Sequence, residues 1–429
     1  MTGTIAAVVF ITLIACLVLT VPIGFSLGIA SLAYILYTHH LTLGFIAQNM
    51  VTGCDSFPTM AIPFFIFAGE LMGGGGISKR LLNLASVFFG RISGGLAIVT
   101  VVVCMFFAAI SGSGPATVAA VGGMVVPTML EKGYDRKFVL ALIAAAGSIG
   151  VIIPPSIPMV IYAVTTNSSV SSLFLAGFVP GLLIGLVLIG YSYFFAKKQG
   201  YKGDTEPFSW SRAWRELKEG FWAILSPVII LGGIYGGVFT PTEAAAVSVI
   251  YSLIVGCFIY KELNLKKLLD VTRNACETTA SILIVIGCAA GFSKVLTLGR
   301  IPTTVASGML SLTDSVILIL LLINVLLLIV GCFMETLCAI MILAPILFPV
   351  VTSLGVDPIH FGIIMVVNLA IGFITPPLGV NLFVASRVGE TTLDQVIKGI
   401  IPFLALMIIT LLVITYIPAV SMFLPNMLG

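Results

Sequence analysis

The chain has 429 residues, of which 59% are hydrophobic and 9% are charged, and its formal net charge is +3. Soluble domains carry about 25% charged residues, and so small a net charge gives no reason to expect a nucleic-acid partner. Apolar stretches of roughly 18 residues or more recur from end to end, which is typical of a polytopic helical membrane protein. The eight cysteines form no CxxC motif, so no metal or disulfide framework is indicated.

The first half predicts a series of apolar helices. Two helices joined by a Val21-Pro22 turn are followed by a third, and then by an amphipathic stretch expected to lie along the membrane interface. Two short apolar runs, separated by small polar residues, predict a re-entrant hairpin. A helix broken at a double proline and a last span complete the half. In order, these segments are 4–20, 23–38, 50–73, 77–91, 92–110 with 116–130, 136–166 and 171–196.

The second half repeats the series. The segment Ile149–Pro155 recurs as Ile371–Pro377, 222 positions later, and Asp135 is matched by Asp357 at the same offset. Paired segments interrupted by glycine and proline are a pointer to a transporter's binding site. The corresponding segments are 220–238, 242–260, 276–298, 301–314, 315–333 with 338–352, 357–387 and 395–420.

Each half therefore has five spans and one hairpin, and an odd number of spans inverts the second copy. We predict an all-α polytopic membrane protein with two inverted repeats, 1–200 and 220–429, joined by a cytoplasmic linker, 201–219. If the N-terminus is outside, 18 of the 20 basic residues fall on one side of the membrane, and only Lys294 and Arg300 fall on the other. The positive-inside rule then places both termini outside the cytoplasm.

The interruptions at membrane depth are the candidate ion sites. Irregular backbone there must be buried or line a wet cavity, and proline frees carbonyl oxygens. Such oxygens, together with hydroxyls, suit Na⁺, although kinks and close packing are the alternative explanation. The candidate ligands at the first hairpin tip and break are Ser111, Gly112, Gly114, Gly150, Ile153 and Pro154. Those at the second are Met334, Glu335, Thr336, Gly372, Thr375 and Pro376.

The candidate substrate site lies beside these breaks. The half-helices that follow them are predicted to begin at Ser156 and Leu378, and free N–H groups at helix N-termini suit an anion. The candidate substrate-binding residues are Ser113, Ser156, Asn381 and Arg387. For Ser156 and Asn381 the alternative is a packing hydrogen bond. Arg387 lies about 15 Å along the helix from the break. The alternative role for Arg387 is a basic anchor at the cytoplasmic face of the membrane.

Acidic residues in apolar runs are functional candidates in a membrane protein. They are Asp55, Glu70, Glu243, Glu277 and Glu335. Glu335 is the most informative because it lies at a predicted hairpin tip. Asp55 and Glu277 occupy matched positions, where we expect each carboxylate to cap the start of a helix.

Several motifs resemble the large membrane subunit of tripartite ATP-independent periplasmic (TRAP) transporters. They are Ala61–Gly69, Ser111–Thr117, Ile153–Ser156 and Ile374–Pro377, and the resemblance covers the whole chain. The segment Asn381–Arg387 resembles the same segment in the sialic-acid branch of this family.

The resemblance implies a bacterial inner-membrane secondary transporter, related to the ion-transporter superfamily and driven by two or more Na⁺ ions. It also implies an elevator mechanism, in which hairpins and broken helices move as one body. The expected partners are a small four-helix membrane subunit, present as a separate chain, and a periplasmic binding protein that delivers an organic anion, with sialic acid favoured.

Other functions stay open at this point. A stand-alone sodium-coupled dicarboxylate carrier of related architecture would need no binding protein. An intramembrane hydrolase would use Ser111 or Ser113, but no acid–base partner lies at a useful spacing. A passive channel fits the paired breaks less well than alternating access does. No Walker A motif is present, so ATP is not expected to be the direct energy source.

Overall fold

The computed structural model describes residues 2–39, 41–203, 209–313 and 315–428, and every regular element in those ranges is a helix. Seven of the described helices are long and apolar enough to cross a membrane, or eight if one bent pair counts as a single span. The predicted all-α polytopic membrane fold is therefore confirmed.

The first half follows the predicted order. Its elements are α1 (Thr2–Val18), α2 (Ile23–Thr38), α3 (Leu43–Cys54), η1 (Pro58–Met60), α4 (Ala61–Gly74), α5 (Ile77–Phe89), α6 (Gly95–Ser111), α7 (Gly114–Glu131), α8 (Arg136–Ser148), η2 (Ile149–Val151), α9 (Ile157–Thr166) and α10 (Val170–Gln199).

One prediction in this half was wrong. A single helix was expected over 50–73, but the chain bends by 65° between α3 and the following helical segment. Pro58 starts the new segment, where its missing N–H costs no helical hydrogen bond. Asp55 consequently follows α3 and does not cap the start of a helix.

The second half contains the matching elements. They are α11 (Trp210–Tyr235), α12 (Pro241–Ile254), η3 (Val255–Ile259), α13 (Leu265–Leu298), α14 (Ile301–Leu312), α15 (Val316–Phe333), α16 (Thr336–Ser353), α17 (Pro358–Gly372), α18 (Val380–Val388), α19 (Leu393–Tyr416) and α20 (Ala419–Leu428).

Two boundaries differ from the sequence prediction. α11 begins at Trp210, inside the segment predicted as linker. α13 is continuous over 34 residues, with no proline to interrupt it, so Glu277 lies within the helix and accepts a hydrogen bond from Arg273 Nε at 2.8 Å. The expected N-cap role of Glu277 was therefore also wrong.

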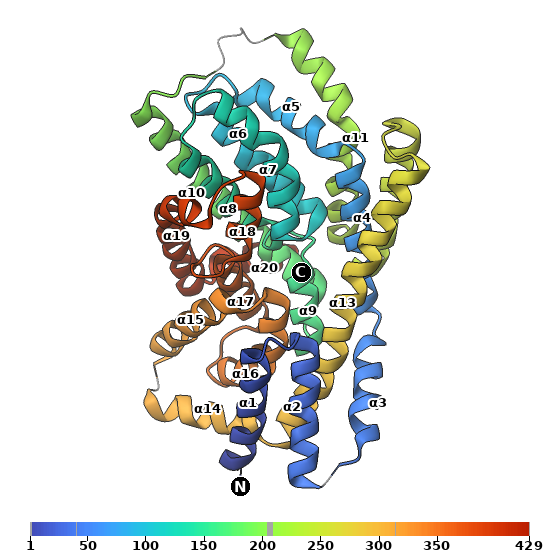
Figure 1. The fold of residues 1–429 in the computed structure, drawn as a ribbon, viewed down its shortest axis with the longest axis vertical. Helices are drawn as coiled ribbons and strands as arrows, with labels where there is room; N and C mark the ends of the chain where they lie inside the picture. Colours follow the sequence, from blue (N-terminus) through green and yellow to red (C-terminus); the bar gives the residue numbers. More distant parts are fainter. Residues whose placement is uncertain (1, 40, 204–208, 314, 429) are drawn as a thin grey trace.

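The helices form two packed groups. α1, α2, α3, α4, α11, α12 and α13 form one packed group, and the hairpins α6–α7 and α15–α16 pack with the broken helices α8–α9 and α17–α18 and with α10 and α19. The amphipathic helices bridge the groups: α5 contacts α6 and α11, and α14 contacts α16 and α13. α5 and α14 lie at opposite ends of the molecule, as inverted repeats require (Figure 1).

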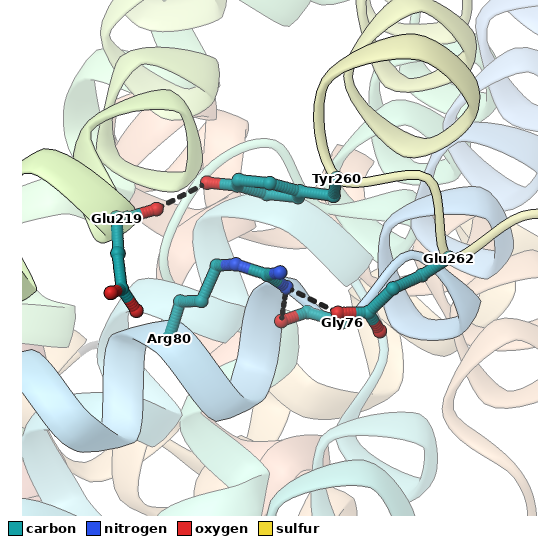
Figure 2. A network of polar contacts seen from close by, with 5 residues as sticks. All are labelled: Gly76, Arg80, Glu219, Tyr260 and Glu262. Carbon is teal, nitrogen blue, oxygen red and sulfur yellow. Dashed lines mark hydrogen bonds and ion pairs between the residues drawn. The ribbon is translucent and has the colours of Figure 1, made fainter.

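Polar contacts fasten α5 to the second half of the chain (Figure 2). Arg80 NH1 donates to Gly76 O at 2.9 Å and pairs with Glu262 Oε1 at 2.6 Å. The guanidinium lies 3.7 Å from the centre of the Tyr260 ring, and the Tyr260 hydroxyl donates to Glu219 O. Gly76, with φ +74°, leaves room for the Glu262 carboxylate, which a Cβ would contact at 2.0 Å.

Candidate substrate and ion site

Three oxygen atoms meet at the tip between α6 and α7. Ser111 Oγ lies 3.1 Å from Thr117 Oγ1 and 3.3 Å from Ser113 O, and the Thr117 hydroxyl donates to Ser113 O at 2.8 Å. Thr117 reaches this carbonyl because it lies four residues beyond Ser113, on the same face of α7. Clustered hydroxyl and carbonyl oxygens are ligands that hard cations take.

Glycines allow this tip to lie directly against the first broken helix. A Cβ on Gly150 would lie 2.6 Å from both Ser113 O and Thr117 Oγ1, which is closer than a real Cβ approaches. Gly112 has φ +59°, and a Cβ there would lie 2.9 Å from Pro155 O. The backbone of the break therefore contacts the tip without intervening side chains.

Ser156 shapes the start of the first half-helix. Its Oγ caps α9 by accepting a hydrogen bond from Met159 N at 3.4 Å, and its hydroxyl donates to Val151 O at 2.6 Å. Ser156 is fully buried. These two partners are backbone atoms of its own broken helix, which is what the packing interpretation expects.

The second tip, between α15 and α16, is built differently. Glu335 is the exposed N-cap residue of α16, while Thr336 is buried with no hydrogen-bond partner for its hydroxyl in the described part of the chain. A Cβ on Gly372 would lie 2.6 Å from the backbone of Gly331, one turn before the tip. The Thr375 hydroxyl donates to Ile371 O at 2.8 Å. The second break therefore packs against α15, one turn before the hairpin tip, and not against the tip itself.

Both tips line one cavity of about 630 Å³, which we call the tip cavity. Ser111, Gly112 and Ser113 come from the first tip, and Glu335 and Thr336 from the second. Further lining residues, from α4, α6, α13 and the two breaks, are Gly69, Glu70, Phe107, Val151, Thr278 and Phe373. The cavity lies where the two groups of helices meet.

The tip cavity has acidic side chains but no basic ones among the described residues that line it. Glu70 and Glu335 are the two carboxyl groups, and the rest of the lining is apolar or carries hydroxyls. An anion entering this space meets like charge, which costs free energy in a medium of low dielectric constant. Cations bound beside the anion would offset that repulsion.

Three predicted substrate residues do not line the tip cavity. Ser156 makes the contacts given above. Asn381 is fully buried, and its Nδ2 donates to Ala144 O at 3.0 Å, which joins α18 to α8. Arg387 is exposed in the last turn of α18. The ion-site candidates that lie outside the lining are Gly114, Gly150, Ile153, Pro154, Met334, Gly372, Thr375 and Pro376.

Sequence reasoning missed other residues of the site. Thr117 carried a usable signal, since its spacing from Ser113 places both on one helix face. Glu70 was recognised as an acid in an apolar run but was not assigned to the site. Thr278 and Phe107 gave no signal, because hydroxyl and aromatic residues at such positions are common in membrane helices.

Known proteins similar to this chain agree on one family. Residues 10–420 match the tripartite ATP-independent periplasmic transporter, DctM component. The chain is 53% identical over 407 residues to the isethionate TRAP transporter permease protein DctMQ of Oleidesulfovibrio alaskensis, an alignment that covers 95% of this chain and 64% of that protein. It is 42% identical to the C4-dicarboxylate TRAP transporter large permease protein DctM of Vibrio cholerae, with 98% of both covered.

The sialic acid TRAP transporter large permease protein SiaM of Vibrio cholerae is 39% identical over 95% of both chains. The relatives thus include isethionate, C4-dicarboxylate and sialic-acid members, and the predicted sialic-acid branch is not singled out. Among solved structures, the Alcanivorax borkumensis YdaH transporter has a similar fold, with a TM-score of 0.63, 16% identity and coverage of 90% of this chain and 89% of that one. From the matched family and the coverage of its relatives, the chain belongs to the DctM component family of TRAP transporters, as a multi-pass membrane permease.

Proposed function

We propose that this permease carries a small organic anion through the tip cavity together with Na⁺. The observation that carries the proposal is the composition of the cavity, in which two hairpin tips and two carboxyl groups face one space with no basic side chain among the described lining residues. An anion binds there favourably when cations accompany it. A sodium gradient then drives uptake because each anion crosses together with cations that move down their own electrochemical gradient.

The first ion is placed at the Ser111–Ser113–Thr117 oxygen cluster, and the second at the tip that carries Glu335 and Thr336. The unpaired buried hydroxyl of Thr336 supports the second placement, since a buried polar group without a partner is costly unless a ligand completes it. Ser111→Ala and Thr336→Ala should each raise the sodium concentration needed for half-maximal uptake, because hydroxyls supplement carbonyl ligands. Unchanged sodium dependence in both variants would count against these sites.

The substrate is placed among small sulfonates and carboxylates. The relative with 53% identity is named for isethionate, while the C4-dicarboxylate and sialic-acid relatives are less similar to this chain. Isethionate is therefore the first substrate to test, ahead of the sialic acid that the sequence favoured. The feature that these anions share is at least one carboxylate or sulfonate group.

The remaining assignments concern the assembly. The hairpins and broken helices form the moving body, α1–α4 and α11–α13 form the scaffold, and α5 and α14 connect them. A separate small membrane subunit and a periplasmic binding protein complete the transporter, with both termini of this chain on the periplasmic side of the inner membrane. The packing of the helices into two groups bridged by α5 and α14 supports this division.

The test is uptake of radiolabelled isethionate, succinate and sialic acid by liposomes that hold the permease with its small subunit. Uptake should require both an inward sodium gradient and the loaded binding protein. Uptake of a dicarboxylate by the permease alone would instead favour a stand-alone carrier. Absence of sodium-dependent uptake for every anion would overturn the proposal.

A further inference from the structure

A second cavity, of about 460 Å³, separates the same two groups of helices at another place. Its walls come from the end of α9, the last turns of α13 and the middle of α16, and it shares no lining residue with the tip cavity. We call it the α9–α13 cavity. The charge pattern places these ends of α9 and α13 on the outer side of the membrane, where an imported anion arrives.

The α9–α13 cavity has the opposite electrostatic character to the tip cavity. Lys294 is the one ionisable side chain among the described residues that line it, and no acidic residue is present. The polar groups that surround it are those of Thr59, Thr165, Thr166, Asn167, Ser293 and Thr297. A cation within a set of hydroxyls and an amide suits an anionic ligand.

Three of these groups have unused hydrogen-bonding capacity. Lys294 forms no ion pair with any residue that the structure describes. The Ser293 hydroxyl and the Asn167 side-chain amide make no hydrogen bond within that part of the chain. Lys294 and Asn167 are exposed, and Ser293 is half-buried. The hydroxyls of Thr165 and Thr297, by contrast, donate to carbonyls of their own helices. Lys294, Ser293 and Asn167 are therefore the groups available to a ligand.

A structural role alone does not account for Lys294. A lysine near the C-terminus of a helix interacts favourably with the helix dipole, wherever its side chain lies. Lys294, however, lines a cavity between the two groups of helices, whereas Arg300, the other basic residue on this predicted face, does not. Lys294 is exposed, one turn before the end of α13, so its ammonium group is accessible to an anion that enters the cavity from the outer side.

We propose that the α9–α13 cavity is a receiving site for the transported anion, in which Lys294 binds its carboxylate or sulfonate group before the anion enters the tip cavity. The inference rests on the proposed function and adds a site to it. Lys294 attracts the anion to the permease, and the absence of carboxyl groups lets the anion dwell there without sodium. The tip cavity then takes the anion together with its cations.

The first readout is transport kinetics in the assembled transporter. Lys294→Gln should raise the KM for uptake about three- to tenfold at low ionic strength and leave kcat close to wild type, because an attracting charge acts on capture. The increase should shrink to less than about twofold near 0.5 M salt, where charges are screened. Lys294→Arg should restore the wild-type KM, and Arg300→Gln is the matched control that should not change it.

The second readout does not depend on transport. A Ser293→Cys variant is labelled with a sulfonated thiol reagent, and modification of that residue is followed by mass spectrometry. Isethionate should slow labelling at least about threefold without sodium, and Lys294→Gln should abolish that protection, as expected for a charge-assisted contact. Liposomes with and without phosphatidylglycerol separate a soluble anion from a lipid headgroup.

Three results would overturn the inference. One is wild-type KM and salt dependence in Lys294→Gln. Another is isethionate protection that survives this substitution. A third is that phosphatidylglycerol in the liposomes slows labelling of the Ser293→Cys variant by itself, and that isethionate does not change this slower rate. If wild-type permease imports the anion while any of these holds, the receiving site is rejected and the proposed function stands. If no anion is imported under any condition, the proposed function fails and the receiving site fails with it.

Discussion

The tip cavity and the α9–α13 cavity lie between the same two groups of helices but carry opposite charge. The first has Glu70 and Glu335 and no base, and the second has Lys294 and no acid, among the described residues. A lysine placed beside the carboxyl groups of the tip cavity would pair with them and would supply the positive charge that we propose the cations supply. The difference between the cavities teaches that attracting an anion and binding it together with cations make opposite electrostatic demands, and two separate places allow one protein to meet both.

The strongest way to break this comparison is to displace the first hairpin tip, which lines the tip cavity, through the glycine that it packs against. Gly150→Ala places a Cβ 2.6 Å from Ser113 O and Thr117 Oγ1. The tip must shift, at a cost of about 1–3 kcal/mol or more, and sodium-dependent uptake should fall at least about tenfold. The control is Gly123→Ala, in α7 of the hairpin that carries Thr117, where a Cβ would meet open space. This variant should behave as wild type in uptake and thermal melting. Equal effects of the two variants would show that the tip is not seated as described.

The charge of the tip cavity provides the next test. Glu335→Gln removes one carboxylate that stabilises bound cations, so the sodium concentration for half-maximal uptake should rise about tenfold, which corresponds to roughly 1.4 kcal/mol. The KM for the anion at saturating sodium should change little. Glu131→Gln, at the exposed end of α7, is the control. A lower sodium requirement in Glu335→Gln would contradict the role of this carboxylate in coupling.

Two threonines, one at each hairpin tip, sharpen the contrast between the tips. Thr117→Val removes a hydroxyl that donates to Ser113 O and should destabilise the protein by about 1 kcal/mol. Thr336→Val removes a buried hydroxyl without a partner, so thermal stability without sodium should stay within about 0.5 kcal/mol of wild type. Thermal melts with and without sodium check this: sodium should stabilise Thr336→Val less than wild type. Equal losses of stability without sodium would mean that the tips are equivalent.

The smallest effect is expected at Arg80, which lines neither cavity. Arg80→Met breaks the ion pair with Glu262 and the contact with Tyr260, and should lower stability by about 1 kcal/mol because these contacts are only half-buried. Labelling of the Ser293→Cys variant and the half-maximal sodium concentration should both stay unchanged. Lys79→Met, at the exposed neighbouring position, is the control. A changed sodium requirement in Arg80→Met would link α5 to the ion sites directly.

Much of the fold could be predicted because repeats constrain one another. The hairpins, the double-proline breaks and the amphipathic helices each appear twice in the sequence, so each copy supports the interpretation of the other. The bend at Pro58 and the long α13 could not be obtained this way, because there the two copies differ.

Side-chain partners were less predictable than segments. His360 is buried in the first turn of α17, with Nδ1 2.7 Å from Ser421 Oγ and Nε2 3.2 Å from Thr415 O. Those partners lie more than fifty residues away along the chain, and only the tertiary packing brings them together. The pairing of Asn381 with Ala144, and the joint lining of one cavity by Glu70 and Glu335, depend on the same kind of long-range contact.

The most direct measurement is an experimental map of the permease with its small subunit, prepared with sodium and with the anion that it transports. The account predicts density for the anion in the tip cavity, between Ser113 and Glu335, with a cation beside the Ser111–Thr117 oxygens. Anion density confined to another place, with the tip cavity empty of both anion and cation in a substrate-saturated sample, would contradict it.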